Sequence, residues 1–214
     1  WPGPLLAVSA LQATGGRPFK VTASPQSVRR WRGNLIDIQI EQSPRCPARL
    51  QLYWRAATKN QLDMEVLVTT TDPFERLEVT TLTEAPASDV FIRSLGSGPG
   101  WINATKFAEL GIESLVVPRD HHAGLISLDG RPPSFTETAI GPPFLSPLVL
   151  YRPREQDWSY AEMSHPDDCF RIIAVPQART TQVSFGLFGL DTEKGVILRG
   201  RVRGAFIPRR GDSD

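Results

Sequence analysis

Residues 34–41 read Asn-Leu-Ile-Asp-Ile-Gln-Ile-Glu, with isoleucine at every second position and acidic or amide side chains between them. Residues 49–55, Arg-Leu-Gln-Leu-Tyr-Trp-Arg, alternate in the same way. Because successive side chains of a strand point to opposite faces of a sheet, this pattern predicts two half-buried strands. The intervening Ser-Pro-Arg-Cys-Pro at residues 43–47 is typical of a turn, so we expect the two strands to be neighbours.

The same period of two recurs along the chain between clusters of Gly, Pro, Asp and Ser. It predicts further strands at residues 19–23, 62–70, 77–82, 90–93, 115–117, 125–128, 148–152, 171–175, 182–190 and 195–206. The last two flank Asp-Thr-Glu-Lys at residues 191–194, a connection typical of a hairpin. Within them, Gly186, Gly189, Gly200 and Gly204 indicate bulges or close approach of another segment to the backbone.

Only residues 103–110 have a convincing helical pattern, with Asn103 as the N-cap and Gly111 at the C-terminal stop. Strands do not alternate with long helical segments, which argues against an α/β fold. We therefore predict an all-β protein, a two-sheet antiparallel β-sandwich of the jelly-roll-like or immunoglobulin-like kind, with one short helix.

A chain of 214 residues lies within the range of a single all-β domain. We expect a flexible N-terminal segment at residues 1–16, one β-sandwich domain at residues 17–208 and a disordered tail at residues 209–214. The apolar run at residues 5–11 resembles the end of a secretory signal. A secreted or periplasmic location is therefore one expectation.

Composition narrows the classes of function. Lys and Arg number 24 against 23 Asp and Glu, so no global charge draws the chain to nucleic acid or to an anionic membrane. No run approaches the ~20 apolar residues of a transmembrane helix. The motifs GxxxxGK[ST], GxSxG, HExxH and CxxC are absent from the sequence. The first hypothesis is therefore a non-catalytic binding or structural module that needs no cofactor.

Two cysteines, Cys46 and Cys169, are too few for a disulfide framework. If they pair, the long closed loop would stabilise the fold by about 4 to 5 kcal/mol in the chain-entropy model. The alternative is two separate thiols, and the sequence leaves both open.

An enzymatic alternative depends on two short polar segments that hold all three histidines. If these loops meet, His121, His122, His165 and Asp168 could bind a divalent metal such as zinc. Glu162 with His165 could also act as a general acid and base. The second hypothesis is therefore a hydrolase or metal-dependent enzyme. The competing interpretation is two unrelated, solvated turns.

Candidate ligand-binding residues are arginines and tryptophans. Arg199, Arg201 and Arg203 share one strand face, about 6.6 to 6.8 Å apart. They could bind an anionic polymer or another protein, or could lie opposite Asp and Glu of a neighbouring strand. Trp101 and Trp158 lie next to loops, where indole rings serve either as platforms for a glycan or as packing.

Two resemblances accompany these patterns. The C-terminal third, including YAEMSHPDD at residues 160–168 and the segment 190–208, resembles uncharacterised bacterial β-rich proteins of unknown activity. Residues 31–54, with Trp-Arg-Gly at residues 31–33 and Arg-Leu-Gln-Leu-Tyr-Trp at residues 49–54, are similar to picornavirus-like capsid jelly rolls. The second resemblance implies a further alternative, a capsid-like assembly subunit.

Overall fold

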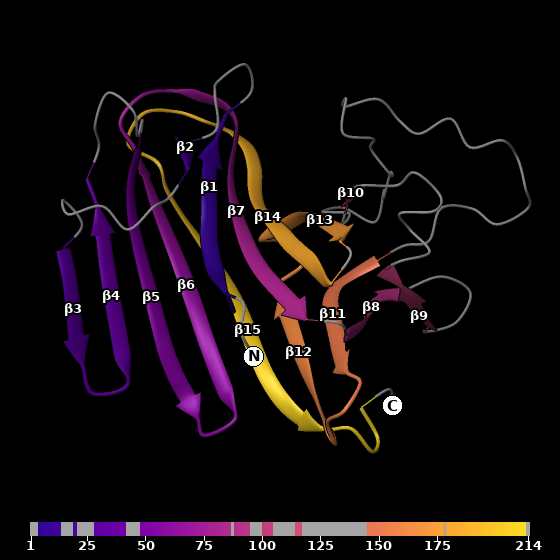
Figure 1. Cartoon of the computed structure of the whole chain (residues 1–214). Coiled ribbons are helices and arrows are strands. Elements are labelled where there is room, and N and C mark those ends of the chain that lie inside the picture. The colour runs from indigo at the N-terminus through magenta and orange to yellow at the C-terminus, as the bar shows by residue number, and fades with distance from the viewer. Residues whose placement is uncertain are drawn as a thin grey trace, which may run out of the picture.

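The structure is a computed structural model that describes residues 4–13, 19–20, 28–41, 48–86, 88–94, 100–104, 114–116, 145–177 and 179–212. Its strands form two antiparallel sheets packed face to face (Figure 1). The predicted two-sheet antiparallel β-sandwich is therefore confirmed. The strand predicted at residues 125–128 lies outside the described residues, as does the helix at residues 103–110 apart from Asn103 and Ala104.

The smaller sheet has six strands. They are β1 (Ala7–Gln12), β2 (Phe19–Lys20), β7 (Phe74–Pro86), β10 (Ser114–Val116), β13 (Cys169–Pro176) and β14 (Thr180–Thr192). Their order in the sheet is β10-β13-β14-β7-β1-β2. The short strands β2 and β10 form its two edges.

The larger sheet has nine strands. They are β3 (Val28–Arg32), β4 (Leu35–Ile40), β5 (Ala48–Thr58), β6 (Gln61–Thr70), β8 (Ser88–Ser94), β9 (Gly100–Asn103), β11 (Leu145–Pro153), β12 (Trp158–Ser164) and β15 (Ile197–Pro208). Their order is β3-β4-β5-β6-β15-β12-β11-β8-β9. The C-terminal strand β15 thus lies in the middle of the sheet and joins its N-terminal strands to the later ones.

The pairing of strands confirms one sequence prediction and corrects another. β4 and β5 are antiparallel neighbours, with Ile38 opposite Leu52, as predicted for residues 34–41 and 49–55. The hairpin predicted between residues 182–190 and 195–206 is wrong. β14 pairs with β7 and β13 in the smaller sheet, whereas β15 pairs with β6 and β12 in the larger one.

Thr70, at the end of β6, holds the connection that carries the chain from β14 to β15. Its hydroxyl donates to the carbonyl oxygen of Glu193 at 2.6 Å and accepts from the amide of Val196 at 3.0 Å. Its backbone carbonyl accepts a hydrogen bond from the amide of Gly195 at 2.9 Å. The segment therefore crosses between the two sheets and does not turn back on itself.

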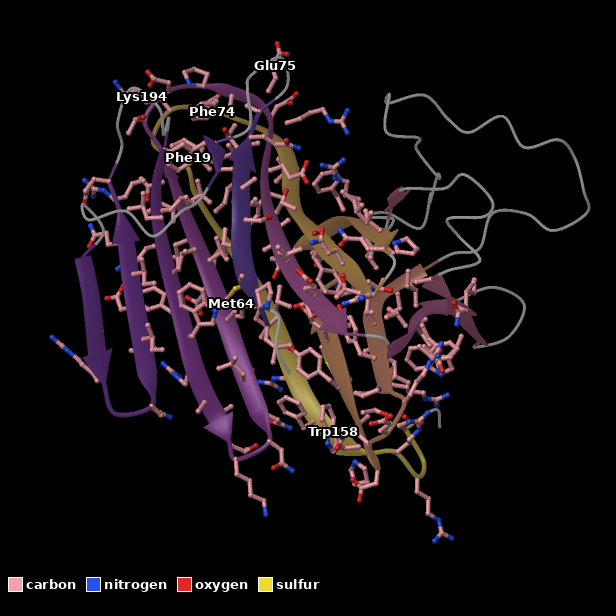
Figure 2. The ribbon with its side chains drawn as sticks, in the orientation of Figure 1. Phe19, Met64, Phe74, Glu75, Trp158 and Lys194 are labelled. Carbon is pink, nitrogen blue, oxygen red and sulfur yellow. The ribbon has the colours of Figure 1, made fainter. Side chains whose placement is uncertain are left out.

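Alternation along the strands places apolar side chains between the sheets. Met64, Val66 and Val68 of β6 are fully buried, and burial of each stabilises the fold by roughly 1.5 to 3 kcal/mol. Figure 2 shows Phe74 at one end of the sandwich and Trp158 at the other, and both pack against this core.

The N-terminal stretch is part of the sandwich. We expected residues 1–16 to be a flexible segment, but β1 within it pairs with β7. Leu6, Val8 and Leu11 are buried in the core. The register of β1 shifts between Val8 and Ala10, so its buried positions break the period of two by which the other strands were predicted.

Residues 209–212, at the start of the expected tail, contact the fold, and the Arg209 amide donates to the carbonyl oxygen of Asp157 at 2.8 Å. The Asp212 side chain is only 2% exposed. It accepts hydrogen bonds from the guanidinium of Arg152, with Nε at 2.9 Å, and from the hydroxyl of Ser159. A partly buried ion pair with an additional hydrogen bond anchors this segment to β11 and β12.

Glycines of β15 admit large side chains from other strands, as the sequence predicted. A Cβ atom at Gly204 would overlap the hydroxyl of Tyr160 and lie 2.7 Å from its Cζ. A Cβ at Gly200 would lie 3.1 Å from the ring of Phe188. Phe188 has a positive φ of 75° at a register shift of β14, and the shift turns this side chain into the core.

We expect Gly204→Ala to lower the free energy of unfolding by roughly 1 to 3 kcal/mol, because the added methyl forces the Tyr160 ring to move. Urea denaturation measures this change. The control is Lys194→Ala, which shortens an exposed side chain in the turn before β15. Equal stability of Gly204→Ala and the parent protein would contradict the packing described.

Candidate functional site

The outer face of the nine-stranded sheet, turned away from the smaller sheet, carries polar side chains in register. These positions alternate with the buried ones on β5, β6 and β15. Two cross-strand rows result, Arg201–Glu65–Tyr53 and Arg203–Asp63–Arg55, each running from β15 through β6 to β5. Side chains opposite one another in neighbouring strands lie within contact distance.

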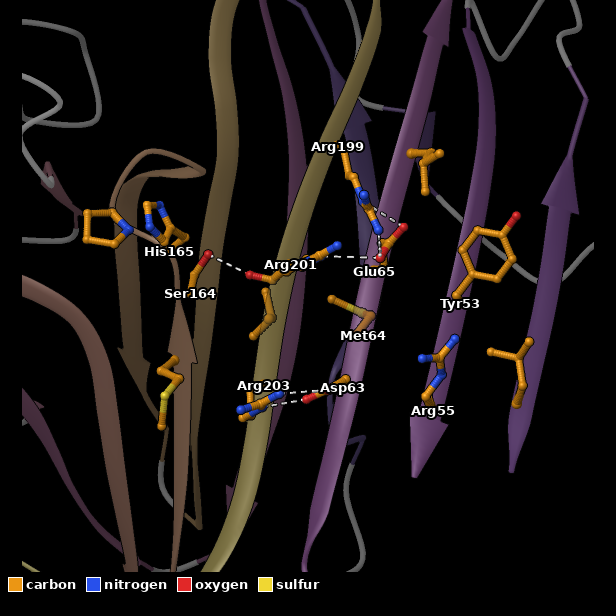
Figure 3. A pocket seen from close by; sticks show the side chains of 15 residues that line it. Tyr53, Arg55, Asp63, Met64, Glu65, Ser164, His165, Arg199, Arg201 and Arg203 are labelled. Carbon is orange, nitrogen blue, oxygen red and sulfur yellow. Dashed lines mark hydrogen bonds and ion pairs between the residues drawn. The ribbon is translucent and has the colours of Figure 1, made fainter. Parts of the chain in front are cut away.

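Ion pairs between β15 and β6 organise this face (Figure 3). Arg199 makes a two-pronged contact with Glu65, at 2.9 and 2.7 Å. Arg203 makes another with Asp63, at 2.6 and 3.0 Å. Arg201 contacts Glu65 only through Nε, at 3.3 Å. The three predicted arginines thus share one face, and acidic side chains of the neighbouring strand lie opposite them.

The arginines keep the two acidic side chains ionised. Hydrogen bonds from Arg203 lower the pKa of Asp63 below its ordinary value, and the positive charges nearby add to this effect. Burial works to raise the pKa of Glu65, but hydrogen bonds and charge from Arg199, with the charge of Arg201, lower it overall. The alternating charges on this face therefore persist at neutral pH.

A pocket of about 850 Å³ lies over these rows. Arg55, Arg199, Arg201, Arg203, Asp63 and Glu65 line it, together with Tyr53, His165 and the apolar side chains of Leu35, Leu67, Met163 and Pro166. Its volume falls within the roughly 300 to 1,000 Å³ of small-molecule sites, which also combine apolar walls with a few polar groups. This pocket is the candidate functional site.

His165 reaches the rim of this pocket from the turn after β12. Its Nδ1 accepts a hydrogen bond from the amide of Asp167 at 3.3 Å, and its side chain is largely exposed. Asp168, in the same turn, accepts a hydrogen bond from the backbone amide of Arg201 at 3.1 Å. The turn is thereby fixed beside β15.

The proposed metal ligands His121 and His122 lie outside the described residues, so their convergence with His165 and Asp168 stays a prediction. In the part of the chain that the structure describes, no three His, Cys, Asp or Glu side chains are grouped as metal ligands would be. One carboxylate oxygen of Asp168, a further predicted ligand, accepts the hydrogen bond from the Arg201 amide.

Glu162 is not in the pocket. It faces the other sheet, is 1% exposed and accepts a hydrogen bond from the Tyr151 hydroxyl at 3.0 Å. Burial raises the pKa of Glu162 to about 7, although Thr83 and Tyr151 favour its charged form. The structure therefore does not bring Glu162 and His165 together as an acid and base, because their side chains leave opposite faces of the sheet.

The two predicted tryptophan platforms, Trp101 and Trp158, lie away from the arginine row of β15 and from each other. Trp101 is on the edge strand β9, four strands from β15, with the guanidinium of Arg93 over its ring at 5.2 Å. Trp158 is on the inner face, edge-on to Phe206 with ring centroids 5.2 Å apart. Of the predicted ligand-binding residues, only the three arginines line the pocket.

Cys169 is buried in β13, where its Sγ lies at hydrogen-bonding distance, 3.2 Å, from the carbonyl oxygen of Arg171. Cys46 lies outside the described residues, so the pairing of the two cysteines stays a prediction. Cys169 does not line the pocket.

Sequence reasoning missed Tyr53 and Arg55, which form the far wall of the pocket on β5. The signal was present in residues 49–55, because both fall on the polar face of the alternating pattern. What was missing was the knowledge that β6 and β15 continue this face.

The fold is similar to that of a putative aldose 1-epimerase from Escherichia coli, with a TM-score of 0.56 over 95% of this chain and 81% of that chain, at 5% sequence identity. This similarity shows the fold, an aldose 1-epimerase-like β-sandwich.

Two further structures have lower TM-scores. An aldose epimerase homologue from C. elegans has a TM-score of 0.47, at 8% identity, over 95% of this chain and 80% of that chain. A heparinase III has a TM-score of 0.49, at 8% identity, over 95% of this chain, which spans only 24% of that protein.

No protein-family model matches the sequence, and no curated protein matches it. The resemblances of residues 31–54 to capsid jelly rolls and of the C-terminal third to bacterial β-rich proteins therefore stay predictions. Within the described ranges, no helix is long and apolar enough to cross a membrane.

The buried carboxyl group of Glu162 predicts a pH dependence of stability. Its pKa is about 7 in the folded protein against an ordinary value of 4.5, so folding favours the protonated form. The contribution of Glu162 to stability is fully present below about pH 4.5 and is lost as the pH rises through about 7, by roughly 3 kcal/mol in total, because the unfolded chain ionises first. Glu162→Gln should flatten this fall and be more stable than the parent protein at pH 8.

Chemical denaturation at a series of pH values measures the effect. Glu193→Gln, which changes an exposed side chain, is the control and should keep the parent's pH dependence. The same pH dependence in Glu162→Gln and in the parent protein would show that folding does not raise the pKa of this carboxyl group.

Proposed function

We propose that this chain is a carbohydrate-binding β-sandwich and that a sugar binds in the pocket on the outer face of the nine-stranded sheet. The observation that carries the proposal is the composition of this pocket, in which aromatic and apolar side chains lie beside rows of charged hydrogen-bonding groups. The aldose 1-epimerase-like fold gives independent support, because the similar E. coli protein is described as acting on a sugar.

The chemistry of the pocket suits the two surfaces of a sugar. The ring of Tyr53 and the side chain of Leu35 on the adjacent strand offer apolar contact to the C–H groups of a pyranose, and Met163 is an apolar side chain at the other end of the pocket. Guanidinium groups donate hydrogen bonds to hydroxyl oxygens. Asp63 and Glu65 can accept from hydroxyl groups as well, because a carboxylate has about four acceptor positions and the arginines fill only part of them.

The positions of the predicted acid and base, Glu162 and His165, favour binding over catalysis. Glu162 is enclosed between the sheets, while His165 is exposed at the rim of the pocket. Asp63 and Glu65 have lowered pKa values, which suits permanent acceptors better than proton donors. A non-catalytic binding module therefore remains the first hypothesis. The metal-dependent enzyme depends on His121 and His122, and the assembly subunit depends on the capsid resemblance.

The test is a panel of neutral and acidic mono- and disaccharides, screened by saturation-transfer NMR and followed by calorimetric titration of each ligand found. We expect Tyr53→Ala to weaken sugar binding about tenfold, because the ring contact is lost, and Tyr53→Phe to retain most of the affinity. Gln51→Ala, at the next outward position of β5 and outside the pocket, is the matched control.

Thermal unfolding checks that each variant is folded. The proposal fails if no sugar in the panel binds the parent protein, or if Tyr53→Ala binds the sugar as tightly as Gln51→Ala does.

A further inference from the structure

The arginines of the pocket differ in how far their hydrogen-bonding capacity is used. Arg199 and Arg203 each direct two nitrogens at both oxygens of one carboxylate, Glu65 and Asp63 respectively. Such a planar, two-pronged pair leaves the guanidinium little freedom to turn toward a ligand. These two arginines serve mainly to hold the acidic side chains in place.

Arg201 has donors to spare. Its Nε makes one long contact, 3.3 Å, to the Glu65 oxygen that Arg199 already uses at 2.7 Å. Its two terminal amino groups make no hydrogen bond to any residue of the described segments, and its side chain is 61% exposed. Its backbone is held firmly, with its carbonyl oxygen accepting from Ser164 at 2.9 Å and its amide donating to Asp168.

Arg55 offers a second unoccupied guanidinium from the opposite side. It lies on β5, two strands from β15, or ~9.5 Å across the sheet. Its charge lowers the pKa of Asp63, yet its side chain makes no hydrogen bond within the described part of the chain. Figure 3 shows Arg55 and Arg201 on either side of β6, with the Asp63 and Glu65 carboxylates between them.

The charges in the pocket do not balance. Four arginines line it against Asp63 and Glu65. Asp168 at the rim adds a third negative charge, which favours the charged form of Arg199, although its carboxylate also accepts from the Arg201 amide. One positive charge stays in excess among these groups, while the exposed Asp167 contacts His165. A neutral sugar would leave this excess uncompensated, whereas an anionic group would pair with it.

We propose, on the basis of the proposed carbohydrate site, that its ligands are acidic sugars and that Arg201, with Arg55 opposite, recognises the carboxylate of a uronic acid. A carboxylate is planar and matches the spacing of two guanidinium N–H groups. Arg201 can present both terminal amino groups to it without breaking a two-pronged pair within the protein. Tyr53, in the same cross-strand row, would contact the sugar ring.

The experiment compares methyl β-glucuronide with methyl β-glucoside, which differ only in the group at C6, by calorimetric titration. The parent protein should bind the glucuronide about tenfold or more tightly than the glucoside, because of the charged hydrogen bonds. Arg201→Gln should remove most of this preference, because it should lower the affinity for the glucuronide much more than the affinity for the glucoside. Arg55→Gln should reduce the same preference to a smaller extent.

The control is Arg49→Gln, an exposed arginine of the same strand as Arg55 that pairs with Glu41 outside the pocket. It should keep the preference of the parent protein. Raising the salt concentration should weaken binding of the glucuronide and not of the glucoside, because only the former relies on exposed charges.

The outcomes separate the two proposals. Equal binding of both sugars by the parent protein, or an unchanged preference in Arg201→Gln, overturns the acidic-sugar inference and leaves the carbohydrate site standing. Binding of neither sugar, together with no ligand in the wider panel, overturns the carbohydrate site itself. A preference for the sulfated counterpart over the glucuronide would overturn the assignment of a carboxylate.

Discussion

The contact of Tyr160 and Phe188 with the backbone of β15 is the constraint on which the larger sheet depends. Both rings occupy the space that a side chain at Gly204 or Gly200 would fill. Positions 200 and 204 must therefore lack a side chain so that these rings can pack against the strand. β15 also joins β6 to β12 and holds the two halves of the nine-stranded sheet together. A loss of this close approach would separate the parts from which the pocket is built.

Because successive side chains of a strand point to opposite faces, the inward glycines of β15 also fix which of its residues face outward. The positions of β15 that alternate with Gly200, Val202 and Gly204 point outward and carry Arg199, Arg201 and Arg203. The register with β6 sets Glu65 and Asp63 against them, and β5 adds Tyr53 and Arg55. One strand thus specifies both the packing of the core and the charge pattern of the pocket. The packed core between the two sheets gives these long side chains a rigid support.

The sequence predicted the class of fold because alternation reports which side chains face the core. It did not predict the partner of each strand, because alternation carries no information about pairing. For this reason the segments 182–190 and 195–206 were expected to form a hairpin, although they belong to different sheets. Part of the site could also be predicted from the sequence, because residues 199–203 show three arginines on one strand face. Tyr53 joins it only through the pairing of β5, β6 and β15, and Glu162 is removed from it because its strand face points inward.

The central claim, that a sugar binds on the outer face of the nine-stranded sheet, is tested most directly by mapping the binding surface. Backbone amide chemical shifts should be followed by NMR during titration with methyl β-glucuronide. The structure predicts that the largest changes fall on β5, β6 and β15 near Tyr53, Glu65 and Arg201. Changes confined to the edge strand β9 around Trp101, or the absence of any saturable change, would contradict it.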